Sequence, residues 1–168
     1  PNDRADTVPI PGFYQEQSQS FVEVEQDALD VGTNAWAAIA LLGLYRRTHE
    51  TQWLEAAKRI GEFILQFRQD TGVFQGYLGG LQNPEGAQPT ERTYAATEHQ
   101  LDVIAVVGML FDATGDSKWQ DAVQHARQFV DKMFDPSTGG HFAGTLDPDT
   151  RNEIPSQLPL DTQSWFVL

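Results

Sequence analysis

The sequence contains an internal repeat, and this repeat restricts the possible folds more than any other feature. Residues 35–45 and 98–113 are both apolar on nearly every side of a helix, and each is followed by a segment with one amphipathic stripe. The turns THETQW and TGDSKW correspond, as do the later loops TGVFQGY (71–77) and TGGHFAGT (138–145). Self-similarity at a fixed period, here about 65 residues, is typical of folds in which similar units stack against one another.

Each unit is predicted to be a helical hairpin. An apolar segment without a polar face indicates an inner helix that is buried on most sides, and an amphipathic segment indicates an outer helix. We therefore predict an all-α fold of stacked helical hairpins that forms one partial domain over 33–168. The expected helices are 33–47, 52–68, 98–113 and 117–134. The expected larger divisions are an irregular lead-in at 1–32 with a short strand at 21–24, hairpins at 33–69 and 97–135, and a third unit that starts at 161.

Composition excludes several classes of function. The 168 residues are 40% hydrophobic and carry a net charge of −13, which fits a globular protein and disfavours a nucleic-acid partner. No apolar run is long enough for membrane insertion. The chain has no cysteine, so disulfide scaffolds, thiolate metal sites and cysteine nucleophiles are excluded. We expect no cofactor and no metal, and the sequence leaves open the oligomeric state and whether the protein is cytoplasmic, periplasmic or secreted.

The predicted functional region is the rim where the inner helices begin. The connections between hairpins are long, those within hairpins are short, and long loops on a rigid scaffold usually carry function. Thr33, Thr97 and Asp161 stand at equal spacing and are good N-cap residues, so we expect them to start the three inner helices. No G-x-S-x-G, phosphate-binding loop, dinucleotide-binding fingerprint or H-E-x-x-H motif is present.

Three acidic residues are the candidate catalytic groups. Glu98 and Asp102 share one face of an inner helix at i, i+4 spacing, and glycoside hydrolysis needs two carboxylates beside the scissile bond. Asp30, just ahead of the first inner helix, is the third candidate. The alternative interpretations are structural: Glu98 stabilises the positive end of the helix dipole, Thr97 and Gln100 form a capping box, and Asp30 is a turn residue.

Polar and aromatic residues near the same rim are the candidate substrate-binding groups. Histidine, carboxamide and carboxylate side chains bind sugar hydroxyls, and aromatic rings stack on the apolar faces of sugar rings. The predicted set is Asn34, Trp36, Tyr77, His99, His141, Asp161 and Gln163, with further rings at Phe74, Phe142 and Trp165. For Trp36 and Trp165 core packing is an equal alternative, for His99 a structural hydrogen bond, and for Asn34 and Gln163 capping or hydrogen bonding to loop backbone. Trp53 and Trp119 are assigned to the core, and His49 and His125 to the surface.

These residues resemble the six-hairpin glycosidase superfamily, the (α/α)6 toroids of carbohydrate-active enzymes. The resemblance depends on VGTNAWAAIALLGLYRRTHETQWLEAAKRI (31–60), TEHQLD (97–102), the two glycine-containing loops and LDTQSW (160–165), so it covers residues 30–168. It implies part of an (α/α)6 toroid with a central cleft, acidic catalytic residues and aromatic sugar platforms. Unlike the α-mannanase-like members, the sequence has no consecutive pair of aspartates.

The resemblance implies a carbohydrate partner and most directly a glycoside hydrolase that uses carboxylates at the inner-helix starts. A sugar epimerase or polysaccharide lyase of the same fold is the first alternative. A non-catalytic helical scaffold that binds glycan or protein is the second.

Overall fold

The computed structural model describes residues 14–15, 20–21, 29–82, 90–152 and 160–165. Its helices are α1 (Val31–Thr48), α2 (Thr51–Leu65), α3 (Thr97–Thr114), α4 (Ser117–Met133) and α5 (Leu160–Trp165). Its strands are two or three residues long: β1 (Tyr14–Gln15), β2 (Ser20–Phe21), β3 (Leu29–Asp30), β4 (Arg68–Gln69), β5 (Gly76–Tyr77), β6 (Gly80–Gln82), β7 (Thr90–Arg92), β8 (Phe134–Asp135), β9 (Gly140–His141), β10 (Thr145–Asp147) and β11 (Thr150–Arg151). Of the strand expected at 21–24, only Phe21 lies within the described residues.

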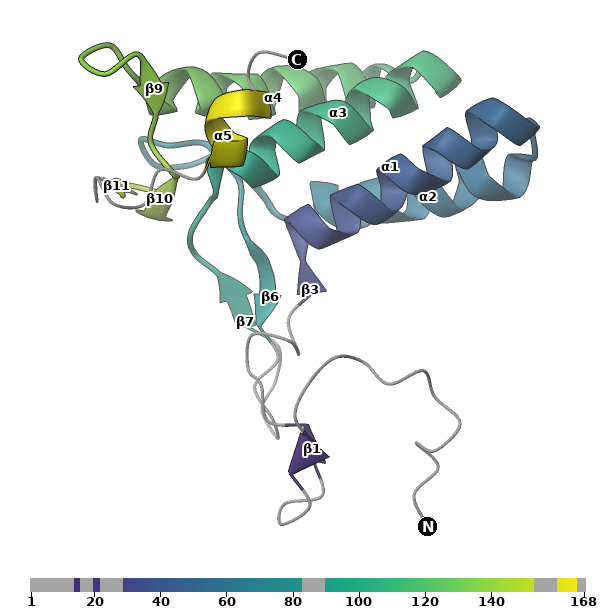
Figure 1. Cartoon of the computed structure of the whole chain (residues 1–168), viewed down its shortest axis with the longest axis horizontal. Helices are drawn as coiled ribbons and strands as arrows, with labels where there is room; N and C mark the ends of the chain where they lie inside the picture. Colours follow the sequence, from purple (N-terminus) through teal and green to yellow (C-terminus); the bar gives the residue numbers. More distant parts are fainter. Residues whose placement is uncertain (1–13, 16–19, 22–28, 83–89, 153–159, 166–168) are drawn as a thin grey trace.

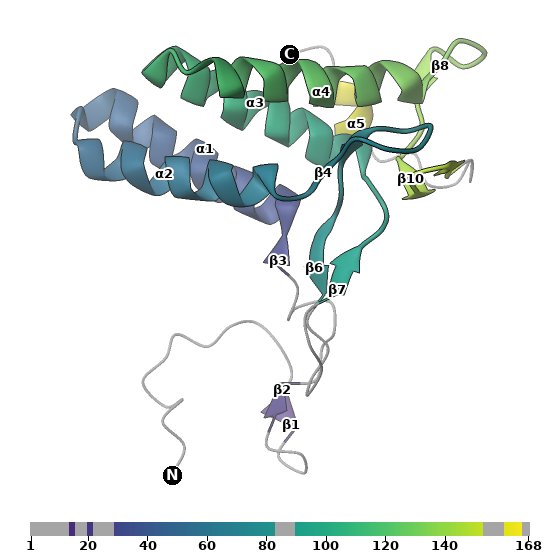
Figure 2. The same cartoon turned by 180° about the vertical axis from the view of Figure 1, so that it is seen from behind.

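The helices form two layers that follow the predicted hairpins. In Figure 1, α1, α3 and α5 lie side by side toward the viewer, and in Figure 2, which shows the opposite face, α2 and α4 lie toward the viewer. Helix α1 packs on α2 and α3, and α3 packs on α4 and α5. The apolar segments are therefore the inner helices and the amphipathic segments the outer ones, as the sequence predicts.

The core lies between the two layers, and Trp119 is its largest buried side chain. Gly61 of α2 makes room for it, because a Cβ at Gly61 would lie 2.6 Å from the Leu110 side chain and 2.9 Å from the Trp119 ring. The assignment of Trp119 to the core is confirmed, and Trp53 is half-buried.

The inner helices are not equally buried. Helix α3 meets neighbours on most sides, as predicted, and its Val103, Val106 and Leu110 are completely covered. Helix α1 differs from the prediction, because Trp36 remains 47% exposed and Leu44 42% exposed. The reason is that α3 lies between α1 and α5 within its layer. Among the described helices, α1 has a neighbour on one side of that layer only, which is α3.

The helix starts differ from the predicted N-caps. Asp30 caps α1 by accepting a hydrogen bond from the Thr33 backbone N–H at 3.1 Å, so Thr33 lies within the helix. Ala96 occupies the N-cap position of α3, and the backbone N–H of Thr97 donates instead to the Ala143 carbonyl at 2.8 Å. Asp161 lies inside α5. At α3 a neighbouring segment thus replaces the local cap, and a sequence pattern cannot reveal such a long-range partner.

A small antiparallel sheet with the order β3-β6-β7 projects from the helix starts (Figure 1). In this sheet Asp30 pairs with Gly80, and Gly80 pairs with Arg92 on its other side. Gly80 has a φ of 112°, and a Cβ there would lie 2.1 Å from the Leu29 carbonyl oxygen. A glycine at this position therefore lets three short strands carry Asp30 and Arg92 toward the start of α3.

Candidate functional site

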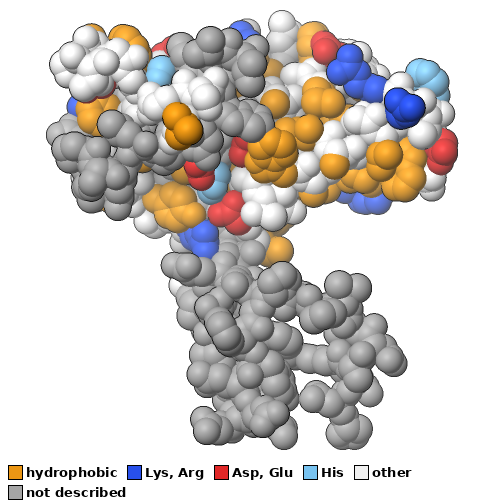
Figure 3. Space-filling model, viewed as in Figure 1, with side chains coloured by type: hydrophobic (Ala, Val, Ile, Leu, Met, Phe, Trp, Pro, Cys, Tyr) orange, Lys and Arg blue, Asp and Glu red, His pale blue; other side chains and the backbone are white. Residues whose placement is uncertain are grey.

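A pocket of about 200 Å³ lies where α1 and α3 begin. In Figure 3 acidic side chains, a histidine and a large hydrophobic side chain gather on this face of the molecule. The lining residues are Asp30, Gly32, Thr33, Trp36, Glu98, His99, Leu101 and Asp102. The pocket therefore contains all three predicted catalytic carboxylates together with Trp36 and His99.

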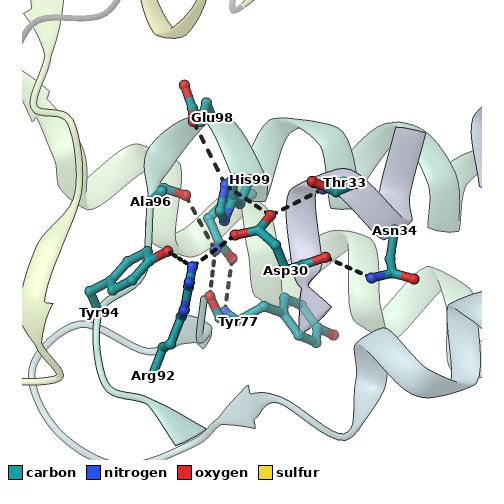
Figure 4. Close-up of polar contacts among 10 residues, drawn as sticks. Asp30, Thr33, Asn34, Tyr77, Arg92, Tyr94, Ala96, Glu98 and His99 are labelled. Carbon is teal, nitrogen blue, oxygen red and sulfur yellow. Dashed lines mark hydrogen bonds and ion pairs between the residues drawn. The ribbon is translucent and has the colours of Figure 1, made fainter. Parts of the chain in front are cut away.

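The Asp30 carboxylate binds groups from two other segments (Figure 4). Its Oδ1 accepts from the Thr33 N–H at 3.1 Å, and its Oδ2 accepts from Nη1 of Arg92 at 3.2 Å. The same Nη1 donates to the Tyr94 hydroxyl at 2.8 Å. The side chains of Asp30 and Arg92 are only 21% and 15% exposed, so this ion pair is mostly shielded from water.

His99 lies between two carboxylates. Its Nε2 is 3.5 Å from Asp30 Oδ1 and 3.7 Å from Glu98 Oε1, and its side chain is 12% exposed. Burial lowers the pKa of the imidazole, Asp30 acts in the opposite direction, and Arg92 lowers it further. The pKa therefore lies below its ordinary value, so the ring is neutral at pH 7.

The absence of a side chain at Gly32 leaves room for the His99 ring. The imidazole lies against Gly32 of α1, where a Cβ would be 2.5 Å from Cδ2 and 2.8 Å from Nε2 of His99. The tilted ring of Tyr94 lies on the histidine at a centroid distance of 6.4 Å. The His99 ring is thus held by groups from α1, β3 and the segment after β7.

Glu98, Asp102 and Trp36 complete the pocket. The Glu98 side chain is 38% exposed in the first turn of α3, and Asp102 follows one turn later with 7% exposure. Trp36 of α1 offers a half-exposed indole. Proton-exchanging carboxylates beside an aromatic surface are groups that suit a sugar ligand.

Several predicted substrate-binding residues lie outside the pocket. Tyr77 and His141 are buried, so their rings do not face solvent. Asn34 donates from Nδ2 to the Asp30 carbonyl at 2.8 Å. Asp161 and Trp165 belong to α5, while Phe74 and Phe142 pack on a second core cluster that contains Phe129 and Met133.

Two glutamines have a repeated structural role, which the sequence analysis missed for Gln100 and gave for Gln163 as the structural alternative of hydrogen bonding to loop backbone. Gln100 accepts from the Tyr77 N–H at 2.9 Å and donates to the Tyr77 carbonyl at 2.7 Å. Gln163 binds both backbone groups of His141 in the same way, at 2.8 Å each. Each glutamine is the fourth residue of an inner helix and binds the second strand after the preceding outer helix, β5 or β9. Gln100 therefore makes no capping box with Thr97.

His125 is a correction to the sequence analysis, because it is 5% exposed and not a surface residue. Its Nε2 lies 3.1 Å from the Gly76 carbonyl oxygen, and its ring meets Tyr77 edge-on with a centroid distance of 5.3 Å. Burial lowers the pKa of His125 and raises the pKa of Tyr77 to about 12. The β4-β5 hairpin folds back over α4 and covers the histidine, which the helical pattern of α4 alone could not predict. His49 is exposed, as predicted.

Arg92 and Tyr94 are the site residues that the sequence analysis did not assign. They lie in a long loop far from Asp30 in the chain, and only the β3-β6-β7 pairing brings them together. The available signal was weak: Arg92 is one of the few basic residues of the long loops.

Within the described segments no group of three or more histidine or acidic residues is arranged to hold a metal ion. No helix in the part of the chain that the structure describes is long and apolar enough to cross a membrane.

Comparison with known proteins identifies the fold. No family model and no curated protein matches the sequence. Among solved structures, a D-mannose isomerase matches with a TM-score of 0.60 at 20% identity, over 81% of this chain and 33% of that one. A cellobiose 2-epimerase from Spirochaeta thermophila matches with a TM-score of 0.63 at 17% identity, over 77% and 32%. A family 76 glycoside hydrolase from a bovine Bacteroides thetaiotaomicron strain matches with a TM-score of 0.60 at 17% identity, over 74% and 26%.

The chain has, in part, the (α/α)6 toroid fold of these structures. It spans about a third of the length of the structures that it matches, which fits part of an (α/α)6 toroid. The resemblance stated from the sequence and the predicted fold class are therefore confirmed. Identities of 20% and below establish the fold and no more than the fold.

Proposed function

We propose that this chain is part of a carbohydrate-active enzyme, a glycoside hydrolase whose chemistry takes place in the pocket between α1 and α3. The observation that carries the proposal is the presence of Glu98 and Asp102 in one pocket with the indole of Trp36. Two carboxylates provide the acid and the base or nucleophile of glycoside hydrolysis, and the indole provides a surface for a sugar ring. The fold adds support, because a family 76 glycoside hydrolase is among the similar structures.

The three carboxylates have different surroundings, and we assign them different roles. Glu98 is the most exposed, so it is our candidate for proton exchange with substrate. Asp102 is buried on the pocket wall one turn along the same helix and is our candidate for the second carboxylate. Asp30 already accepts hydrogen bonds from Thr33 and Arg92, so an orienting role suits it better than direct catalysis.

The test is a hydrolysis assay on a panel of oligosaccharides and polysaccharides with the variants Glu98→Gln and Asp102→Asn. Loss of a general acid or base reduces turnover by about 10²–10⁴-fold, and each variant should still bind glycan. Asp112→Asn is the matched control, because Asp112 is an exposed carboxylate near the opposite end of α3. An inactive wild-type protein that binds glycan would support a binding module instead. A protein that does neither would support a scaffold.

His99 favours a second candidate function, sugar epimerisation or isomerisation. A neutral imidazole beside carboxylates can donate a hydrogen bond to a carbonyl oxygen, which makes the neighbouring C–H easier to deprotonate. The similar structures include a cellobiose 2-epimerase and a D-mannose isomerase. Incorporation of deuterium from D2O into a reducing sugar, lost in His99→Asn and retained in Glu98→Gln, would favour this reaction over hydrolysis.

A further inference from the structure

We propose that Arg92 is a positioning residue, which acts through Asp30 to hold His99 in one orientation and one tautomer, with the proton on Nε2. The proposal rests on the proposed function, because it explains how that pocket keeps the Nε2–H of its central imidazole in a fixed place beside the carboxylates. The four side chains form a continuous line in the order Arg92, Asp30, His99 and Glu98 (Figure 4).

The first contact of the line fixes the carboxylate. Arg92 Nη1 and the Thr33 N–H each donate to a different oxygen of Asp30, and the Tyr94 hydroxyl fixes Nη1 on its other side. Breaking a shielded ion pair at one partner leaves an uncompensated charge, so the carboxylate and guanidinium keep each other in place. Arg92 on Oδ2 and the Thr33 N–H on Oδ1 thus together determine where the Asp30 oxygens lie.

The second contact determines the tautomer of His99. Both neighbouring carboxylate oxygens, at 3.5 Å and 3.7 Å, lie beside Nε2. Carboxylates are acceptors, so the neutral ring is most stable with its proton on Nε2. Nδ1 then carries the lone pair and is buried without a hydrogen-bond partner among the described residues, so the group that faces the carboxylates is the Nε2–H.

The surrounding groups keep the ring from turning. Gly32 lies against one edge of the imidazole, and the Tyr94 ring lies on it. The charged and titratable groups that face His99 are Asp30 from β3, Arg92 from β7, Tyr94 from the following segment and Glu98 from α3. Asp30 raises the pKa of His99 and Arg92 lowers it, so removal of Arg92 has a defined sign.

The experiment is NMR of the uniformly ¹⁵N-labelled protein, with long-range correlations that report the tautomer and pKa of each histidine. In the wild-type protein His99 should show a protonated Nε2 and a pKa below 6.5. In Arg92→Gln the pKa of His99 should rise, because Asp30 then acts without its opposing cation, and the tautomers should mix. Arg92→Lys should bring the pKa of His99 back toward its wild-type value, because it returns the positive charge. It should restore the Nε2-protonated tautomer less completely, because a lysine lacks the geometry of the guanidinium group.

The control is Arg127→Gln, which removes the same charge from the exposed side of α4 and should leave His99 unchanged. Once a substrate is known, the low-pH limb of the activity profile should move to higher pH in Arg92→Gln, a change that simple loss of folded protein would not cause. A protonated Nδ1 in the wild type, or an unchanged His99 in Arg92→Gln, would overturn the proposal. Neither result depends on turnover, so absence of hydrolysis would count against the proposed function and leave this assignment standing.

Discussion

Gln100 is the residue whose removal should most directly test how the hairpins are joined. Its carboxamide is completely buried and satisfies both backbone groups of Tyr77, at 2.9 Å and 2.7 Å. Gln100→Ala would leave a buried N–H and a buried carbonyl without partners, and each costs about 1–3 kcal/mol. We therefore expect the free energy of unfolding to fall by about 2–6 kcal/mol, a large fraction of the total for a domain of this size.

The matched comparison is Gln163→Ala. Gln163 makes the same two hydrogen bonds to His141, at 2.8 Å each, but these bonds are only partly buried. Water can replace the lost amide at this position, so the loss should be about half as large or less. Urea unfolding followed by circular dichroism gives both values by linear extrapolation.

The variant Gln100→Glu separates hydrogen bonding from volume. A carboxylate of the same shape can accept from Tyr77 N–H but turns a second acceptor toward the Tyr77 carbonyl. Its folded-state pKa should be raised, so the variant should gain stability as the pH falls and the carboxyl becomes a donor. A loss below about 1 kcal/mol in Gln100→Ala, or an equal or larger loss in Gln163→Ala, would refute the argument from buried backbone groups.

Three further predictions concern the helix ends and the histidines. Gly32→Ala should displace the His99 ring, because the new Cβ would lie 2.5 Å from Cδ2, and histidine NMR should show the pKa of His99 return toward 6.5. His49 and Gly115 each end an inner helix with a positive φ, at 58° and 68°, a conformation that glycine adopts without a steric cost. Gly115→Ala should therefore lower the free energy of unfolding by about 1 kcal/mol, whereas His49→Gly should not lower it. Urea unfolding measures both values. The lowered pKa values of His99 and His125 mean that the unfolded chain binds protons more readily, so their contribution to stability is complete above pH 6.5 and is lost as the pH falls below it. A melting temperature that stays constant from pH 7.5 to 5.5 would contradict this last prediction.

The sequence predicted the helical hairpins well because their determinants are local. A period of 3.6 in the apolar residues separates α2 and α4, which have one buried stripe, from the nearly all-apolar α3. Trp119 belongs to such a stripe, and it is buried as expected. The error at α1 has the same physical basis, since a pattern shows which faces are apolar but not whether a neighbour covers them.

The candidate site was predictable in part for a related reason. Asp30, Glu98 and Asp102 stand next to the starts of inner helices, and these starts converge, so their approach to one pocket follows from the repeat. Arg92 reaches the pocket through strands of two or three residues, which are too short to show a period. The role of Gln100 was missed because its partner, the backbone of Tyr77, carries no sequence signature.

The glutamine contacts also define where this molecule can be divided. Each binds a strand of the preceding hairpin, so the cooperative unit extends across the boundary between two sequence repeats. A cut between β6 and β7 would separate Tyr77 from Gln100 and leave each half with buried polar groups exposed. Fragments or hybrid proteins should keep each outer helix, its strand and the following inner helix together, because neighbouring repeats of this kind stabilise each other through their shared contacts.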